Sequence, residues 1–169
     1  MANTITLKIE AIIKEESVTL TVDDPSSVDE IRELAVDQWN ESNVTEETEY
    51  EATTNDTILL NVIDWDETPE KLRELDEDFF SFVEHFKDSN YDVDVFEAAL
   101  NLDIPFSDID EAYQGTYSTD QDFAQEMAKQ LGSLDKNASW PMNCIDWEYA
   151  AKELMYDYSS DNCHYFRNL

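Results

Sequence analysis

The chain opens with two runs in which apolar and polar residues alternate. The apolar members of these runs are Ile5, Leu7, Ile9, Val18, Leu20 and Val22. Alternation with a period of two is typical of strands that bury one face. The residues between the runs, Lys14-Glu-Glu-Ser17, predict the turn of a hairpin. Two further strand-like runs, 49–54 and 57–65, meet at Asn55-Asp56.

A helical period separates these two pairs of predicted strands. Apolar residues recur every three to four positions, at Val28, Ile31, Ala35 and Trp39. Ser26 or Ser27 is placed to cap the N-terminus of this helix, and Glu30 completes a capping box. Residues 1–67 are therefore predicted to form an α+β unit.

From Thr68 onward the pattern is mainly helical. Thr68-Pro69-Glu70 predicts an N-cap followed by proline in the first turn, with a helix that continues to about Lys87. Further helices are expected over 92–100, 107–113, 119–132 and 144–158. Gly132 is placed to end the third of these, and Tyr165-Phe166 predicts a short final strand.

Charge changes this ordinary picture, because 41 acidic residues face 10 basic ones and the formal net charge is −31. Solubility alone needs a magnitude of about 2 to 8 in a small domain. Residues 1–67 hold 18 acids and 3 bases, and residues 68–169 hold 23 acids and 7 bases, so no acidic tail explains the excess. Because 41% of the residues are hydrophobic and 12% aromatic, the chain is expected to fold.

The acids are arranged in series along the predicted helices. Asp29, Glu33 and Asp37 stand one turn apart, opposite the apolar stripe of the first helix. The last predicted helix carries a similar series, namely Asp146, Glu153 and Asp157. Like charges at this spacing destabilise a helix by roughly 0.2–0.5 kcal/mol per pair. Selection for stability alone does not favour such series.

Duplex DNA offers a physical comparison for this charge. It carries one negative charge per roughly 1.7 Å of axis, so a charge of −31 corresponds to about 15 base pairs. A rigid carboxylate array can therefore occupy a groove that is built for phosphates. From composition alone, salt adaptation or ordinary solvation is favoured over a DNA mimic, and an acidic partner for some basic protein is a further alternative.

The C-terminal half carries a more specific pattern. One segment reads Ile109-Asp-Glu-Ala-Tyr-Gln-Gly-Thr-Tyr-Ser-Thr-Asp-Gln-Asp-Phe-Ala124, and after a predicted helix another reads Cys144-Ile-Asp-Trp-Glu-Tyr-Ala-Ala-Lys-Glu-Leu154. The chain then ends in Tyr156-Asp-Tyr158 and Asn162-Cys-His-Tyr-Phe-Arg167. In order and spacing these segments resemble the C-terminal part of the ArdA antirestriction proteins.

The resemblance is good over 106–169, fair over 68–105 and absent before residue 68, where the family's Tyr-Asn-x-Gly segment is missing. It implies an elongated α+β chain of small α/β subdomains, in which a strand-helix-strand unit is followed by a mainly helical part. The implied domains are an acidic α+β N-terminal domain (1–67), a helical middle domain (68–105) and an ArdA-like C-terminal domain (106–169).

The resemblance also implies a function. The protein is expected to occupy the DNA-binding groove of type I restriction-modification enzymes as a homodimer, without catalysis, cofactor, metal or direct contact with nucleic acid. The unmatched first third motivates an alternative. In that alternative, the protein is a DNA mimic or acidic adaptor for another host protein, such as a nucleoid protein, an RNA polymerase or another defence complex.

The candidate DNA-mimic surface has two sets of acids. The set that matches the family pattern is Asp110, Glu111, Asp120, Asp122, Asp146, Glu148, Glu153 and Asp157. The set added from the rest of the chain is Asp29, Glu33, Asp37, Glu74, Asp78, Glu84, Asp92 and Asp94. Fold-keeping roles are implied for Tyr113, Gly115, Tyr117, Phe123, Trp147 and Tyr158, with a turn at Gly115.

Other chemistry is poorly supported. The segment 88–99 has calcium-loop spacing, but Val93 and Ala99 replace the glycine and glutamate that such a loop needs. Asp64 and Asp66 are interpreted as cap and dipole partners of a helix start. Cys144 is expected in the core, and the chain has no CxxC pair for zinc.

The absence of a membrane-spanning run of about 18 apolar residues and of a secretory leader predicts a cytoplasmic protein.

Overall fold

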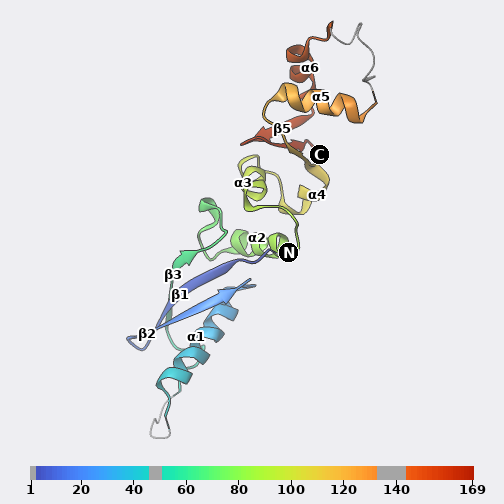
Figure 1. Cartoon of the computed structure of the whole chain (residues 1–169). Coiled ribbons are helices and arrows are strands. Elements are labelled where there is room, and N and C mark those ends of the chain that lie inside the picture. Colours follow the sequence, from blue (N-terminus) through green and yellow to red (C-terminus); the bar gives the residue numbers. More distant parts are fainter. Residues whose placement is uncertain (1–2, 46–50, 133–143) are drawn as a thin grey trace. The chain divides into compact units, whose positions relative to one another are not determined.

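The structure is a computed structural model that describes residues 3–45, 51–132 and 144–169 (Figure 1). It is α+β, as predicted, with two small antiparallel sheets. The chain divides into two compact units, Met1–Asp94 (unit 1) and Val95–Leu169 (unit 2). The division into three domains at residues 67 and 105 stays a prediction. Among the described residues, no helix is both long enough and apolar enough to cross a membrane.

The sheet of unit 1 contains three antiparallel strands in the order β2-β1-β3. The strands are β1 (Thr6–Ile13), β2 (Glu16–Asp23) and β3 (Ile58–Trp65). The predicted hairpin is confirmed, and its two turn residues, Lys14 and Glu15, have φ angles of 53° and 68°. The alternating pattern follows from the fold, because the odd-numbered residues from Ile5 to Ile13 are fully buried.

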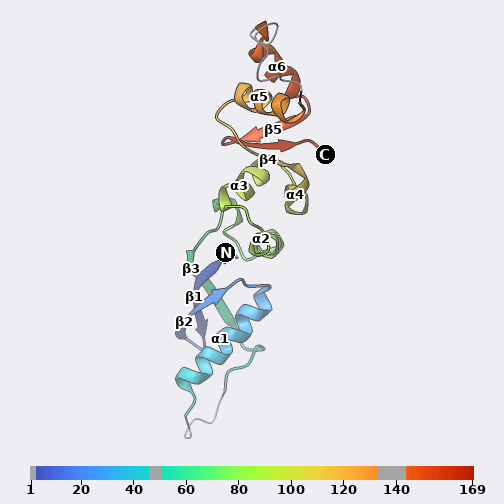
Figure 2. The same cartoon turned by 45° about the vertical axis from the view of Figure 1, so that its right-hand side comes forward.

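Helix α1 (Val28–Asn43) lies along one face of this sheet (Figure 2). It buries Ile31, Ala35, Val36 and Trp39, much as the sequence predicts. Ser27 is the N-cap, and its Oγ accepts a hydrogen bond from the Glu30 amide at 3.1 Å. In a standard capping box the Glu30 side chain would contact the N-cap residue itself. Here it contacts Ser26, the residue before the N-cap. Oε2 of Glu30 accepts hydrogen bonds from the backbone amide and the hydroxyl of Ser26, both at 2.7 Å.

The predicted strand over 49–54 is wrong for its described residues, and positions 49 and 50 lie outside the described part. Residues 51–54 form no strand. Instead, the side-chain amide of Asn40 donates to the carbonyl of Ala52 at 3.0 Å and accepts from its backbone amide at 2.7 Å. Because α1 satisfies both backbone groups of Ala52, this segment is held by the helix rather than by the sheet.

The helix predicted to begin after Thr68 begins later. A short 3-10 helix, η1 (Glu70–Leu72), comes first, and α2 (Glu77–Lys87) follows with Asp76 as its N-cap. The Asp76 side chain accepts from the Phe79 amide at 3.0 Å, whereas the buried Thr68 donates its hydroxyl to the carbonyl of Asp66 at 2.9 Å. Thr68 is therefore not a cap. The end of α2 at Lys87 and the helix α3 (Val93–Asn101) agree with prediction.

Unit 2 contains short helices and a three-stranded sheet of order β4-β6-β5. After α3, its elements are η2 (Phe106–Asp108), α4 (Ile109–Ala112), β4 (Tyr113–Thr116), α5 (Asp120–Gln130), α6 (Trp147–Leu154), β5 (Tyr158–Asp161) and β6 (His164–Arg167). Helix α5 with its Thr119 cap, Gly132 beyond its end and strand β6 are confirmed. Strands β4 and β5 are not predicted from the sequence, and α6 is shorter than predicted.

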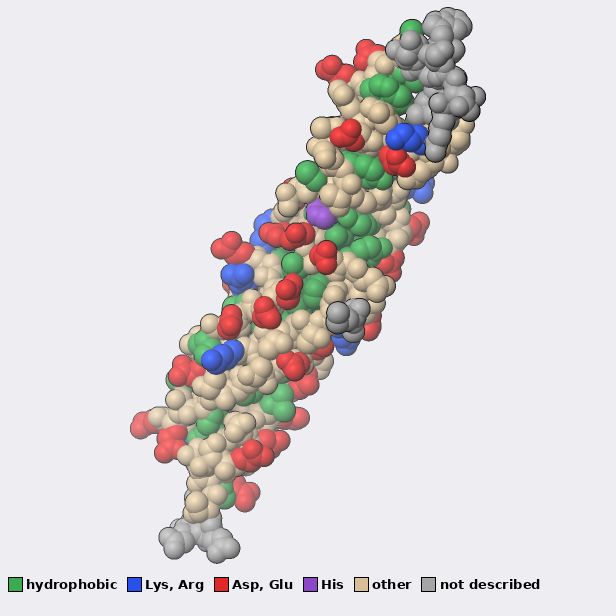
Figure 3. Space-filling model, in the orientation of Figure 1, with side chains coloured by type: hydrophobic (Ala, Val, Ile, Leu, Met, Phe, Trp, Pro, Cys, Tyr) green, Lys and Arg blue, Asp and Glu red, His purple; other side chains and the backbone are tan. Residues whose placement is uncertain are grey.

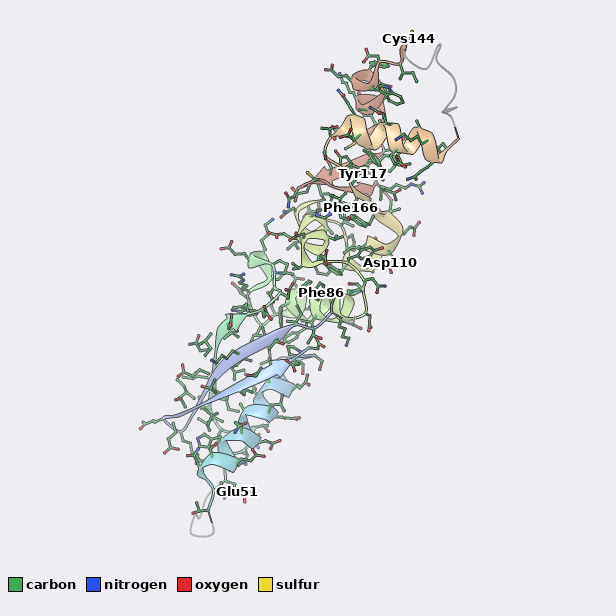
Figure 4. All side chains as sticks on the ribbon, viewed as in Figure 1. Glu51, Phe86, Asp110, Tyr117, Cys144 and Phe166 are labelled. Atoms are coloured by element: carbon green, nitrogen blue, oxygen red, sulfur yellow. The ribbon has the colours of Figure 1, made fainter. Side chains whose placement is uncertain are left out.

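An aromatic cluster forms the core of unit 2 around Phe123, which is fully buried. Its ring centroid lies 4.6 Å from that of Tyr165, 5.0 Å from Tyr117 and 5.0 Å from Tyr158. Gly115 has a φ of +117° at a register shift in β4, so it supplies a bulge rather than the predicted turn. Figure 4 labels Tyr117 near the sheet of this unit.

Candidate acidic surface

The sixteen candidate carboxylates share one property, which is exposure to solvent. Each of them is exposed, and no Asp or Glu among the described residues is buried. Figure 3 shows acidic side chains over the visible surface of both units, with few lysines and arginines between them. Both units therefore present negative charge at their surface.

Helix α1 carries the predicted acidic series. Asp29, Glu33 and Asp37 are exposed and lie opposite the buried stripe that includes Ile31 and Ala35. Arg32 interrupts the series and forms an ion pair with Asp29, with an Nη1 to Oδ1 distance of 3.5 Å. Among the described residues, no hydrogen-bond or ion-pair partner contacts the carboxylates of Glu33 and Asp37. The sheet that packs against the other face of α1 fixes the positions from which these charges project.

The remaining candidate acids of unit 1 surround α2 and the start of α3. They are Glu74, Asp78, Glu84, Asp92 and Asp94, and all five are exposed. Sequence reasoning missed the density of acids in this region. Eight acids lie between Asp64 and Asp78, and each of them is exposed. A simple count of acids per segment finds this region.

Asp64 and Asp66 belong to this dense region and do not have the predicted role. The nearest α-helix begins at Glu77, and its cap is Asp76. Asp64 lies in β3, where it pairs in register with Lys8 of β1. The interpretation of Asp64 and Asp66 as cap and dipole partners is therefore wrong, and both carboxylates contribute to the acidic surface.

Unit 2 holds several of its candidate acids with hydrogen bonds, unlike Glu33 and Asp37 of α1. The hydroxyl of Tyr165 donates to Oδ1 of Asp120 at 2.7 Å. Tyr165 is only 3% exposed, and burial, with a further contribution from Asp120, raises its pKa well above the ordinary range. Because the Tyr165 ring is packed in the aromatic core, it holds the Asp120 carboxylate in place. Asp110 also lies at the surface, on α4 (Figure 4).

Two further acids of unit 2 take part in helix caps. Asp146 is itself an N-cap, and Asp122 contacts the N-cap Thr119. Oδ2 of Asp122 accepts from the hydroxyl of Thr119 at 2.9 Å, and this hydroxyl also accepts from the Asp122 amide at 3.1 Å. Asp146 caps α6 by accepting from the Tyr149 amide at 3.1 Å. These acids stabilise the helix starts on which they lie.

The acidic series predicted on the last helix is wrong, because α6 ends at Leu154. Asp146 precedes the helix as its cap, and Asp157 follows it, where its carbonyl accepts from the Asn168 amide at 2.9 Å. Of the predicted series only Glu153 lies in the helix, together with Glu148 of its first turn. The chain leaves the helix early because Tyr158 begins strand β5 beside β6.

The two cysteines lie at the surface, and Trp147 lies only partly beneath it. Cys144 and Cys163 are both exposed, so the expectation that Cys144 lies in the core is wrong. Trp147, an expected fold-keeping residue, is half-buried. Within 3–45, 51–132 and 144–169, no group of three or more potential ligands gathers at metal-binding distance.

Each unit contains an open pocket of mixed charge. The pocket of unit 1, about 620 Å³, is lined by Pro25 and Ser26 and by residues of α2 that include Glu77, Glu84 and Lys87. The pocket of unit 2, about 540 Å³, lies between the start of α5 and α6, and its lining includes Asp120, Glu148 and Lys152. In both pockets carboxylates stand beside a lysine, so fixed surface charge remains the main chemical property of the described residues.

Comparisons of the chain with protein-family models, with curated proteins and with solved structures gave no match.

Proposed function

We propose that this protein is a DNA mimic that inhibits type I restriction-modification enzymes by occupying their DNA-binding groove. One observation carries the proposal: every candidate carboxylate is exposed on a described element or beside one, while no acid is buried among the described residues. Folding therefore leaves these charges available to a partner. A protein that uses acids for catalysis or metal binding typically buries or clusters some of them, because such sites need perturbed pKa values or shared ligands.

Attraction between the carboxylates of this protein and the basic groups of the enzyme provides the binding energy. A DNA-binding enzyme presents lysines and arginines to phosphates, and their neutralisation releases counterions. Carboxylates on α1 repeat about every 6 Å along the helix axis, since four residues rise 1.5 Å each. Folded elements hold these charges before the encounter, so little conformational entropy is lost on binding.

The C-terminal pattern supports the more specific target. Its aromatic residues Tyr117 and Tyr158 both contact Phe123 in the core of unit 2. Its acids lie outside that core, at the exposed positions described above. An aromatic scaffold with acids on its outside is the arrangement that the resemblance to ArdA proteins implies. With that resemblance the proposal includes a homodimer without catalytic activity, acting in the cytoplasm of a bacterial host.

Competition for the enzyme tests this function directly. The purified protein is added at a tenfold molar excess to a type I restriction enzyme that holds a labelled duplex, at about 50 mM salt. We expect release of the duplex, and a steep loss of this effect by about 200 mM salt, because counterion release weakens as salt rises. Poly-glutamate at equal total charge serves as the control and is expected to compete far less, since its charges are not held in place.

A duplex that stays bound at low salt would contradict the proposal. Equal competition by poly-glutamate would show that unspecific charge is sufficient. Circular dichroism from about 50 mM to molar salt tests salt adaptation. A chain that unfolds at 50 mM salt and folds only at molar salt would assign the acids to that role instead.

A further inference from the structure

The sheet of unit 1 has a second face that α1 does not cover. Helix α1 packs against the side formed by the buried odd-numbered residues of β1. The other side, here called the open face, presents the alternate residues of all three strands. These are Thr6, Lys8, Glu10 and Ile12 of β1, Ser17, Thr19, Thr21 and Asp23 of β2, and Leu59, Asn61 and Asp64 of β3, with Ile63 as the extra residue at the register shift beside Asp64.

Large apolar side chains are exposed on this open face. Leu59 is 60% exposed and Ile63 is 50% exposed, and Ile12 lies beside Leu59 in the strand register. Hydroxyl groups of β2 adjoin them on the other side of β1. The charged residues of this surface are Lys8, Glu10, Asp23 and Asp64, and α1 on the opposite side of the sheet presents an acidic series. Exposed large apolar side chains that share one face of an otherwise charged protein mark a candidate interaction site.

The charges around the apolar area indicate the sign of the charge on a partner. Glu10 lies in the middle strand, and Asp23 and Asp64 lie at the ends of the two outer strands. Lys8, opposite Asp64, is the base among these residues. The net charge around the open face is therefore negative, and basic groups beside an apolar stripe complement it.

The size of the open face selects the shape of a partner. Three strands of eight residues cover roughly 27 by 14 Å, or about 400 Å². A stable dimer buries about 800 Å² per partner, so this face alone is too small for a second copy of the chain. A single helix has a diameter of about 10 Å, and about 18 of its residues span 27 Å. One helix therefore matches both dimensions.

We propose that the open face docks a basic amphipathic helix of a partner protein. The apolar stripe of that helix covers Leu59, Ile63 and Ile12, and its lysines or arginines face Glu10, Asp23 and Asp64. This contact is separate from the acidic series on α1 and does not depend on the DNA-mimic function. The hydrogen-bonded strands supply a preformed surface, so the partner alone is ordered on binding.

Binding of a defined peptide tests the proposal. The probe is an 18-residue helical peptide with leucines along one side and lysines along the other, and the control is a scrambled peptide of the same composition. The full chain is titrated with each peptide by isothermal calorimetry at about 0.15 M salt. We expect the amphipathic peptide to bind at least tenfold more tightly than the scrambled one.

Variants of the chain locate the contact. The double substitution Leu59→Ser with Ile63→Ser is expected to weaken binding of the amphipathic peptide at least tenfold. Asn61→Lys adds a positive charge between these two residues and is expected to weaken binding at least threefold. Asp29→Asn with Glu33→Gln is the matched control. It is expected to change affinity less than threefold, because the α1 charges lie across the sheet and the Debye length is about 8 Å at this salt. All substituted residues are exposed, and circular dichroism checks the fold.

Two results would overturn the proposal. The first is equal binding of the scrambled peptide, or an affinity that the Leu59 and Ile63 substitutions leave unchanged. The second is sedimentation in which those substitutions convert a dimer to a monomer, since the open face would then bind a second copy. Competition with the labelled duplex is measured on the same variants, so failure of the peptide contact is distinguished from failure of the mimic function.

Discussion

The acidic series on α1 and the acids around α5 and α6 of unit 2 are displayed in different ways. On α1 of unit 1, Glu33 and Asp37 project from a helix that is anchored by its opposite face, and the described residues provide their carboxylates with no partner. In unit 2, Asp120, Asp122 and Asp146 each accept a hydrogen bond from a named donor. The carboxylates of Glu33 and Asp37 thus form no contact with the described residues that stabilises the fold, whereas these three carboxylates of unit 2 do.

This difference decides how a loss of charge is to be interpreted. Removing the carboxylate of Glu33 or Asp37 removes a repulsion and breaks no hydrogen bond or ion pair among the described residues. Removing Asp120 leaves the hydroxyl of the buried Tyr165 without its acceptor, which costs stability as well as charge. Inhibition assays on α1 variants therefore report charge alone, whereas variants of unit 2 need a measurement of folding beside them.

The largest effect is expected in the aromatic core of unit 2. Phe123→Ala removes a fully buried ring that contacts Tyr117, Tyr158 and Tyr165, and we expect the free energy of unfolding to fall by about 3–5 kcal/mol. Urea denaturation measures the loss, and hydrogen exchange of β4 and β6 locates it. Phe123→Leu, which keeps most of the volume, is the control. A loss below about 1.5 kcal/mol for the alanine variant would show that this ring does not organise the unit.

The contact between Tyr165 and Asp120 is expected to have the next largest effect. Tyr165→Phe keeps the packed ring and removes the donor, so we expect a loss of about 1.5–3 kcal/mol, as for other hydrogen bonds to charged groups. Asp37→Asn on α1 is the matched comparison and is expected to change stability by less than about 0.5 kcal/mol. Equal losses in the two variants would remove the distinction between the units.

The same contact predicts a pH dependence. The pKa of Tyr165 is raised in the folded state, chiefly by burial, so folding favours its neutral form. Stability from this group is complete below the unfolded pKa of about 10 and falls above it, by up to about 1.4 kcal/mol per pH unit. Unfolding measured between pH 9 and 11 is expected to show this decline in the native chain and a smaller one in Tyr165→Phe. Identical slopes would contradict it.

A change of charge sign is expected to act in opposite directions in the two units. Glu33→Lys converts two repulsions, with Asp29 and Asp37, into attractions, and we expect a gain of about 0.5–1 kcal/mol at low salt. Asp122→Lys removes an acid from the first turn of α5 and its contact with Thr119, and we expect a loss of about 1 kcal/mol. Thermal unfolding at about 20 mM and 500 mM salt measures both effects, and salt is expected to reduce them. A loss for Glu33→Lys would contradict the comparison.

Local signals in the sequence predict the elements that depend on neighbours along the chain. The alternation around Ile9 and Leu20 predicts β1 and β2, and Ser27 and Thr119 mark the starts of α1 and α5 as hydrogen-bonding caps. Exposure of the candidate acids is predictable for a similar reason. Burial of a carboxylate is costly, so acids opposite an apolar stripe remain in solvent.

The local pattern does not predict the elements that depend on contacts between residues far apart in the sequence. Strands β4, with Tyr-Gln-Gly-Thr, and β5, with Tyr-Ser-Ser-Asp, are four residues long and lack apolar alternation, and they form beside the buried Tyr165 and Phe166 of β6. The error at Thr68 arose because proline fits the first turn of a helix, whereas here it precedes a 3-10 turn. The partner of Asp120 lies 45 residues away in the sequence, so no spacing rule reveals it.

The smallest effect concerns a feature that the two units share. Each has a two-residue hairpin turn whose second residue is left-handed, Glu15 with a φ of 68° and Cys163 with a φ of 69°. A side chain in this conformation costs roughly 1–2 kcal/mol, and glycine avoids that cost but loses roughly 0.5–1 kcal/mol of backbone entropy on folding. We therefore expect Glu15→Gly and Cys163→Gly each to stabilise the chain by about 0.5 kcal/mol.

The shift of the urea midpoint measures these gains, and Glu15→Gln separates conformation from charge. If conformation alone matters, the glutamine variant remains near the native stability and the two glycine variants gain equally. A clear gain for Glu15→Gln would show that repulsion among the unit 1 acids reaches the hairpin turn, in addition to acting along α1. Such a result would extend the contrast between the units to a turn whose backbone geometry is the same in both.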